Sequence, residues 1–220
     1  MKVFICLLLL CNSILFAQVN ESKSKWAFGL LGSAAASYRF TSSDANNSWL
    51  KNEIDSSETW SSGYSYGIST DYVLSEKLSL RSGLSFSKCG QSYRDLTNYQ
   101  SFRVAYQFFE LPVILRFALP LDKAKLIFGA GPEATLMMRS RAMYQSISDV
   151  SMNKTNINDA SLQKLGMALA TQISYDRSIS TNSHIEFGIQ YREQILSIAQ
   201  GSIQRLPFSL GVFLGFRQTF

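Results

Sequence analysis

Residues 206–220 read LPFSLGVFLGFRQTF, and this stretch decides the fold that we expect for the chain. Its large apolar side chains fall on alternate positions: Leu206, Phe208, Leu210, Val212, Leu214 and Phe216. Small or polar residues occupy the positions between them, with Phe213 as the one large apolar exception. A period of two is typical of a β-strand with two unlike faces. The stretch therefore favours a strand that faces lipid on one side and a packed or wet lumen on the other.

Seven further stretches repeat this pattern and are separated by polar segments of unequal length. The eight predicted strands cover residues 26–40, 60–74, 78–88, 104–117, 125–138, 165–177, 184–192 and 206–220. Long polar loops are predicted at 41–59, 89–103, 139–162 and 193–205, and short turns at 75–77, 118–124 and 178–183. In outer-membrane barrels the short turns are periplasmic and the long loops are extracellular. The predicted fold is therefore all-β, an eight-stranded antiparallel up-and-down transmembrane β-barrel with short periplasmic turns and long extracellular loops.

A soluble eight-stranded barrel of the lipocalin kind is the main structural alternative. Such a barrel would place its large apolar residues inside and cover its outside with charge. Here the face opposite the apolar stripe is rich in Gly, Ser and Ala and carries few charges, which favours the membrane barrel. A mean hydropathy near zero is compatible with it, because a barrel carries its membrane signal in the alternation.

The composition of the chain limits which classes of protein it can belong to. Aromatic residues make up 13% of the chain, which fits aromatic girdles at the membrane surfaces. The net charge is only +5, and we find no Lys/Arg cluster interleaved with aromatics, so nucleic-acid binding is not expected. About 200 residues beyond the leader form one domain, which we place at 18–220.

Residues 1–17 resemble a cleaved secretory signal peptide, with Lys2 before an apolar run and a plausible cleavage site after Ala17. A lipoprotein signal ending at Cys11 is the alternative, although Leu10 stands where a small residue is expected. Loss of the leader removes Cys6 and Cys11 and leaves Cys89 alone, so no internal disulfide is expected.

Two segments resemble a known family. Residues 106–117, YQFFELPVILRF, and residues 128–132, FGAGP, are similar to consecutive strands of the PorT-like outer-membrane β-barrel family of Bacteroidetes-type bacteria. This resemblance implies export to the outer membrane of a Gram-negative bacterium, contact with outer-membrane lipid and the barrel fold. Phe220 is similar to the terminal signal read by the barrel insertion machinery, although Gln218 departs from the usual aromatic or apolar residue. Most members of the family have no assigned activity.

The small-residue face also carries charges, and we expect them inside the barrel. The predicted interior charge network comprises Asp71, Arg81, Glu110, Arg116, Glu133, Asp176, Glu186, Arg192 and Arg217. Six of these lie toward the periplasmic half, whereas Glu110, Glu133 and Arg192, together with Arg39, lie higher. An eight-stranded lumen is just wide enough for side chains to fill, so interior charges must be paired or hydrated. The hypothesis is a paired network that plugs the lumen, and the alternative is a narrow ion path or proton relay.

We expect no catalysis, no cofactor and no metal site. His184 is the only histidine, so a histidine-based metal cluster is excluded. His184 and Glu186 share the inward face of their strand and could form a base with its orienting acid, as in a lipid-modifying barrel enzyme. No Gly-x-Ser-x-Gly nucleophile elbow accompanies them, because the one stretch with these letters, residues 63–67, lies inside the predicted strand 60–74 and not at a turn from a strand into a helix. Pro112 removes a ladder donor and predicts a local bend or bulge, with Glu110 paired inside.

The expected function is a structural or interaction role at the outer membrane, through the loops or the periplasmic face. The loop aromatics either contact a partner or lie in the membrane-interface belt; they are Trp49, Trp60, Tyr93, Tyr99 and Tyr144. A narrow-channel porin and a subunit or assembly factor of an outer-membrane secretion system are the alternatives.

Overall fold

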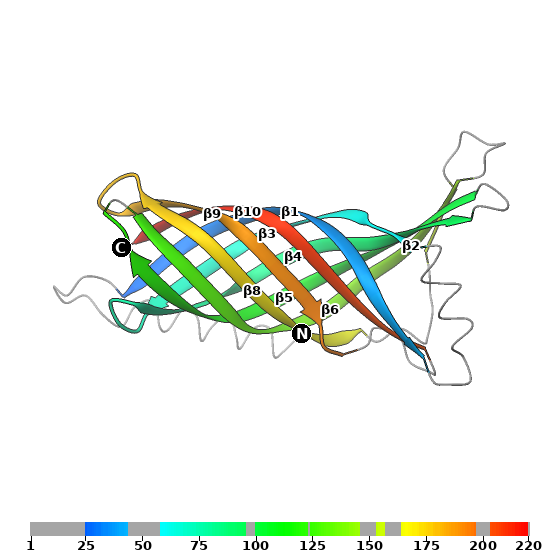
Figure 1. Ribbon diagram of the computed structural model, residues 1–220, viewed down its shortest axis with the longest axis horizontal. Coiled ribbons are helices and arrows are strands. Elements are labelled where there is room, and N and C mark those ends of the chain that lie inside the picture. The colour runs from blue at the N-terminus through cyan, green and yellow to red at the C-terminus, as the bar shows by residue number, and fades with distance from the viewer. Residues whose placement is uncertain are drawn as a thin grey trace.

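The computed structural model describes residues 25–43, 58–95, 100–122, 124–145, 153–156, 164–196 and 203–219. Within them, eight long antiparallel strands form a closed barrel (Figure 1), which confirms the predicted fold class. The eight strands are β1 (Trp26–Ser43), β3 (Ser61–Val73), β4 (Leu78–Asp95), β5 (Gln100–Pro120), β6 (Ala124–Gln145), β8 (Leu165–Ser178), β9 (Ser183–Gln194) and β10 (Ile203–Thr219). Pairing of β1 with β10 and of β4 with β5 completes the ring. In these residues no helix is long and apolar enough to cross a membrane.

The large apolar side chains point outward from this ring. Leu30, Val212 and Leu214 are each 62% exposed, whereas Asp71 and Glu186 are buried inside. Register aligns the apolar residues of adjacent strands, because Leu30 lies opposite Ile68 on β3 and Phe216 on β10. The exposed face is therefore a continuous apolar belt around the barrel, as lipid contact requires and as a lipocalin would not have.

Several strands are longer at the loop end than the sequence predicts. The predicted loop at 89–103 is wrong: β4 continues to Asp95, β5 begins at Gln100, and Ser92 pairs with Arg103. β6 likewise continues to Gln145, into the predicted loop at 139–162. The sequence predicts a strand from the contrast between its apolar and its polar face. That contrast exists only where one face contacts lipid. Beyond the membrane both faces are polar, so the pairing persists while the sequence signal disappears.

The loop side of the barrel divides into two arms, which diverge toward the right in Figure 1. One arm, the β1–β10 arm, continues to the pair formed by Ser43 and Ile203. The other, the β4–β6 arm, is the extension of β4, β5 and β6 and carries the short strands β2 (Glu58–Thr59) and β7 (Asn153–Asn156) on its edges. The arms separate because β3, which lies between β1 and β4, begins only at Ser61.

A β-bulge interrupts the pairing of β5 with β6 near the loop end. The register shifts between Gln107 and Phe108, which leaves Met138 as the extra residue. The bulge does not lie at Pro112: Pro112 pairs with Glu133 and Leu115 pairs with Ala130 in one constant register. A bulge of this kind re-aims the side chains that follow it.

Candidate functional site

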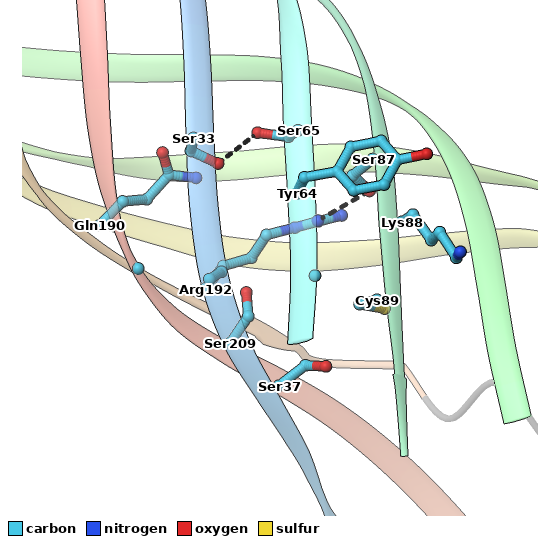
Figure 2. A pocket seen from close by; sticks show the side chains of 13 residues that line it. Ser33, Ser37, Tyr64, Ser65, Ser87, Lys88, Cys89, Gln190, Arg192 and Ser209 are labelled. Atoms are coloured by element: carbon cyan, nitrogen blue, oxygen red, sulfur yellow. Dashed lines mark hydrogen bonds between the residues drawn. The ribbon is translucent and has the colours of Figure 1, made fainter. Parts of the chain in front are cut away.

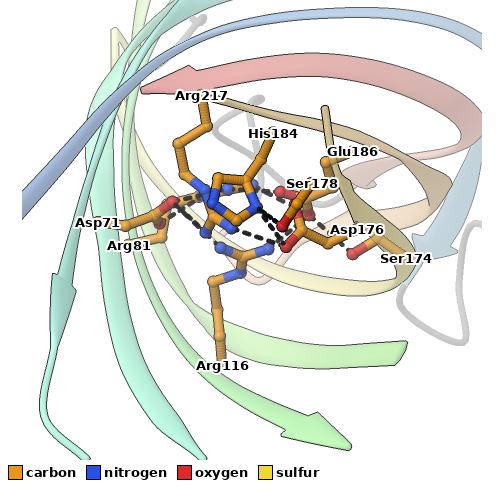
Figure 3. Close-up of polar contacts among 9 residues, drawn as sticks. All are labelled: Asp71, Arg81, Arg116, Ser174, Asp176, Ser178, His184, Glu186 and Arg217. Atoms are coloured by element: carbon orange, nitrogen blue, oxygen red, sulfur yellow. Dashed lines mark hydrogen bonds and ion pairs between the residues drawn. The ribbon is translucent and has the colours of Figure 1, made fainter. Parts of the chain in front are cut away.

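Six charged side chains meet in the lumen near the short turns, and we call them the turn-side cluster (Figure 3). They are Asp71 of β3, Arg81 of β4, Arg116 of β5, Asp176 of β8, Glu186 of β9 and Arg217 of β10. Each lies close to the short-turn end of its strand and on the inward face, so the barrel brings together residues that are far apart in the sequence.

Asp71 is the acid shared by all three arginines of this cluster. Arg81 grips it with two bonds, Nε to Oδ1 at 2.8 Å and Nη2 to Oδ2 at 2.9 Å. Arg116 and Arg217 each donate from Nη1 to Oδ2 at 3.1 Å. Paired hydrogen bonds between a guanidinium and a carboxylate are among the strongest polar contacts in proteins.

Glu186 binds two of these arginines, Arg81 and Arg116, from the opposite wall. Arg81 Nη2 donates to its Oε2 at 2.7 Å, and Arg116 Nη2 to its Oε1 at 2.5 Å. Ser174 Oγ adds a bond of 2.7 Å, and Arg217 Nη2 reaches Asp176 Oδ2 at 2.8 Å. Three carboxylates thus face three guanidinium groups, and the cluster has no net charge. Neutrality and dense hydrogen bonding are what allow ions to remain buried.

The other three predicted residues form a second group, the central cluster. Arg192 of β9 pairs through Nη1 with Glu110 of β5 and through Nε with Glu133 of β6, the latter at 2.5 Å from Oε1. Ser87 Oγ donates to Glu110 Oε1, and Ser85 Oγ lies 3.1 Å from Glu110 Oε2. One guanidinium therefore serves two carboxylates, with serine hydroxyls supplying further hydrogen bonds.

Apolar side chains fill other parts of the lumen. Val104, Tyr106, Phe108 and Met137 form a buried cluster against Cys89, and the Phe108 ring lies 6.0 Å from the Arg192 guanidinium. Phe213, the exception in the outward stripe of β10, is likewise buried inside. These contacts explain why large apolar residues occur on the otherwise small or polar inner face.

A small cavity remains beside the central cluster, against the wall of small residues on β1, β3 and β10 (Figure 2). Ser33, Ser37, Ser65 and Arg192 help to line it. Its volume is about 20 Å³, and a water needs about 10–15 Å³. The cavity is therefore of the size of a hydration site.

The geometry around His184 differs from a catalytic relay. His184 Nδ1 lies 3.4 Å from Asp176 Oδ2 and 3.3 Å from Ser178 Oγ, so both neighbours lie at the same ring nitrogen. In a Ser-His-Asp triad the acid and the nucleophile occupy opposite nitrogens. The pairing with Glu186 considered from the sequence is not formed, because Arg81, Arg116 and Ser174 bind that carboxylate. Within the described segments, no three His, Cys, Asp or Glu residues gather closely enough to hold a metal.

Some sequence-predicted features fall outside the described residues: the leader 1–17, Trp49, Tyr99, Phe220, and the side chains of Arg39, Tyr93 and Tyr144. Trp60 is described, 54% exposed, and its ring centroid lies 5.5 Å from those of Tyr38 and Phe208 on the outer face. Sequence reasoning missed Ser85, Ser87 and Ser174 as partners of the buried acids. Their inward position in the alternation was the available signal.

The closed ring and its apolar belt define a transmembrane β-barrel protein. Residues 16–195 match the model of the outer membrane protein beta-barrel domain, and the chain belongs to this family. Family and fold together place it in the outer membrane of a Gram-negative bacterium. No curated protein matches the sequence.

Solved structures with a similar fold are barrels of distant sequence. Outer membrane protein OprG from Pseudomonas aeruginosa is 10% identical, with a TM-score of 0.52 over 90% of this chain and 98% of its own. Neisserial surface protein A is 15% identical, with a TM-score of 0.49 over 91% and 100%. The outer membrane protease OmpT from Escherichia coli is 8% identical, with a TM-score of 0.47 over 93% and 99%. At such identities the likeness to OprG shows the fold alone.

Proposed function

We propose that this protein is a non-catalytic, non-conducting outer-membrane barrel that presents its loop-side arms to a partner. The observation that carries the proposal is the extra length of paired strand outside the membrane. A membrane-spanning strand needs about 9–11 residues, whereas β5 and β6 have 21 and 22. From Phe109, the last outward aromatic of β5, the strand runs on to Gln100, roughly 30 Å at 3.3 Å per residue. Such an ordered extension on a rigid barrel supports a binding role.

The filled lumen supports a closed barrel over a narrow-channel porin. The ions of the neutral turn-side cluster bind a passing ion poorly, because each is already paired with an opposite charge. The turn-side cluster crosses the lumen from β3 to β9 through Arg81 and Arg116. We therefore expect no stable conductance steps in planar bilayers, and reproducible steps from the wild-type protein would replace this proposal with the porin.

The interaction role is tested by the native mass of the protein extracted from its own outer membrane in mild detergent. The variant replaces residues 92–103 with Asn-Gly, which joins Gln91 directly to its pairing partner Val104. A stoichiometric companion that is lost in this variant supports the proposal. A lone monomer in both samples overturns it. Heat-modifiable migration on gels checks that the shortened barrel still folds.

Two finer statements belong to the same proposal. Membership of the PorT-like branch is supported by the segments YQFFELPVILRF and FGAGP, and a secretion-system subunit is the form of partner role that this branch suggests. If residues 1–17 are a signal peptide that is cleaved, the mature chain begins at Gln18. Mass spectrometry of the purified protein tests this. A lipid-modified Cys11 at the N-terminus would contradict it.

The geometry of His184 supports the absence of catalysis. Because acid and hydroxyl share one ring nitrogen, His184 cannot pass a proton between them as a triad histidine does. Turnover of lipid A or phospholipid that disappears in the His184→Ala variant would overturn this part of the proposal.

A further inference from the structure

A row of cations lies on the outer surface of the β4–β6 arm, just beyond the apolar belt. On β4 the outward position after Phe86 is Lys88, and on β6 Met138 is followed outward by Arg139 and Arg141. Arg103 occupies an outward position on β5, between these two strands. We call Lys88, Arg103, Arg139 and Arg141 the basic row.

The strand register places these residues side by side. Gln107 of β5 pairs with Lys88 on one side and with Arg139 on the other, and its outward neighbour Ala105 pairs with Arg141. Arg103 follows on the same face and reaches over to β3, where its Nη2 donates to the Ser62 carbonyl at 2.9 Å. The four cations thus share one patch of the arm.

The bulge at Met138 is the reason that β6 contributes to this patch. Before the bulge, even-numbered residues of β6 such as Ala134 and Leu136 face outward, and Glu133 faces the lumen. Without the extra residue, Arg139 and Arg141 would continue the inward series. With it, Met137 points inward and both arginines point outward. The irregularity therefore moves two positive charges from the lumen to the surface.

The described carboxylates of these strands point into the lumen, away from the basic row. Among the described side chains of β4, β5 and β6, the two carboxylates are Glu110 and Glu133, and both are buried in the lumen against Arg192. The described charges on the outer face of these strands are therefore positive, and a ligand that carries negative charge would complement them.

Aromatic rings fix the level of this patch relative to the membrane. Tyr64 stacks on Tyr66 at 6.3 Å, Tyr66 lies 5.4 Å from Phe86, and Phe86 lies 5.9 Å from Phe109. Lys88 Nζ lies 5.9 Å above the Tyr64 ring, at the loop-side edge of this aromatic ledge. Aromatic belts occupy the headgroup level of a membrane. Lys88 and Arg139, at the level of Gln107, therefore lie among the headgroups of the outer leaflet, and Arg141 and Arg103 follow just beyond them.

We propose that the basic row binds the phosphate groups of lipid A, the phosphorylated glycolipid of the outer leaflet. Guanidinium groups match phosphate oxygens with paired hydrogen bonds, and lysine adds a point charge. The acyl chains would lie along the apolar belt below, on the same strands. The barrel thus carries a lipid-binding surface in addition to its proposed contact with a protein partner. Lys88, Arg139 and Arg141, which are changed in the test below, lie outside the segment 92–103 that tests the protein contact.

Native mass spectrometry of the full mature barrel in detergent tests this with three lipids: bisphosphorylated lipid A, its dephosphorylated form and phosphatidylglycerol. The variant combines Lys88→Gln, Arg139→Gln and Arg141→Gln. The matched control combines Lys77→Gln, Lys125→Gln and Arg177→Gln, which removes three exposed cations at the turn end instead. A cation near an anionic surface contributes about fivefold in affinity, so we expect about 100-fold weaker lipid A binding in the variant.

The proposal expects the wild-type and control proteins to bind bisphosphorylated lipid A alike, and the dephosphorylated form at least tenfold more weakly. Equal wild-type affinity for both forms overturns it, and this comparison needs no variant to fold. Equal affinity for phosphatidylglycerol also overturns it, because the surface would then be a general anionic-lipid patch. An equal loss in the control overturns the assignment to the basic row.

Discussion

Removing the charge of Asp71 is the sharpest test of the turn-side cluster. Asp71 accepts hydrogen bonds from Arg81, Arg116 and Arg217, so Asp71→Asn leaves three guanidinium groups against two carboxylates in a closed site. Breaking a buried ion pair by removing one partner costs about 3–5 kcal/mol. We therefore expect the free energy of unfolding to fall by that amount while the shape of the side chain is preserved.

A second substitution restores the charge balance and separates electrostatics from packing. Arg217 is the most exposed member, with 13% of its side chain accessible, and its acid partners are Asp71 and Asp176. The double variant Asp71→Asn with Arg217→Gln keeps two carboxylates and two guanidinium groups. Because the two residues are in contact, their effects should not add, and we expect the double variant to lose at least about 1 kcal/mol less than the sum of the two single losses.

The assay is urea unfolding of the barrel in lipid vesicles, followed by tryptophan fluorescence and by the heat-modifiable band on gels. Asp122→Asn is the control, because Asp122 is an exposed carboxylate after β5. A surface change of this kind should stay within about 0.5 kcal/mol of wild type. A value for Asp71→Asn inside that same window, or strict additivity in the double variant, would refute the reasoning.

Three further predictions concern packing in the lumen and between strands. Gly131→Ala should destabilise the barrel by about 1–3 kcal/mol, because its Cβ would collide with the Val113 carbonyl oxygen, whereas Gly32→Ala, with nothing within 4 Å, should be neutral in the same urea titration. Phe213→Ala should cost about 3–5 kcal/mol by leaving a void in the lumen, and Phe216→Ala on the lipid-facing side should cost less; equal losses would contradict the inward position of Phe213. Cys89, which lies against the buried apolar cluster, should react with a maleimide slowly in the folded barrel and rapidly in urea, and fast labelling of the folded protein would show that the lumen is open.

The interior charges show how much of the site the alternation of residues along a strand can predict. Parity along each strand is enough to assign Asp71, Arg116 and Glu186 to the inner face, because a strand directs successive side chains to opposite sides. Parity does not say which acid meets which base. Asp71 on β3 meets Arg116 on β5, and Glu186 on β9 meets Arg81 on β4, only because closure and stagger of the barrel bring opposite walls to one level.

The sequence by itself determined the membrane-spanning part of this protein. There one face of every strand contacts lipid, so apolar residues must alternate with small or polar ones. Stretches such as LPFSLGVFLGFRQTF therefore predict the fold without any knowledge of the tertiary structure. Tertiary structure alone decided which acid pairs with which base, the length of the β4–β6 arm and the outward turn of Arg139 and Arg141 at the bulge. The reason is physical: where both faces of a strand are wet, or where partners come from opposite walls, backbone pairing and closure determine the arrangement, and neither depends on a local pattern of side chains.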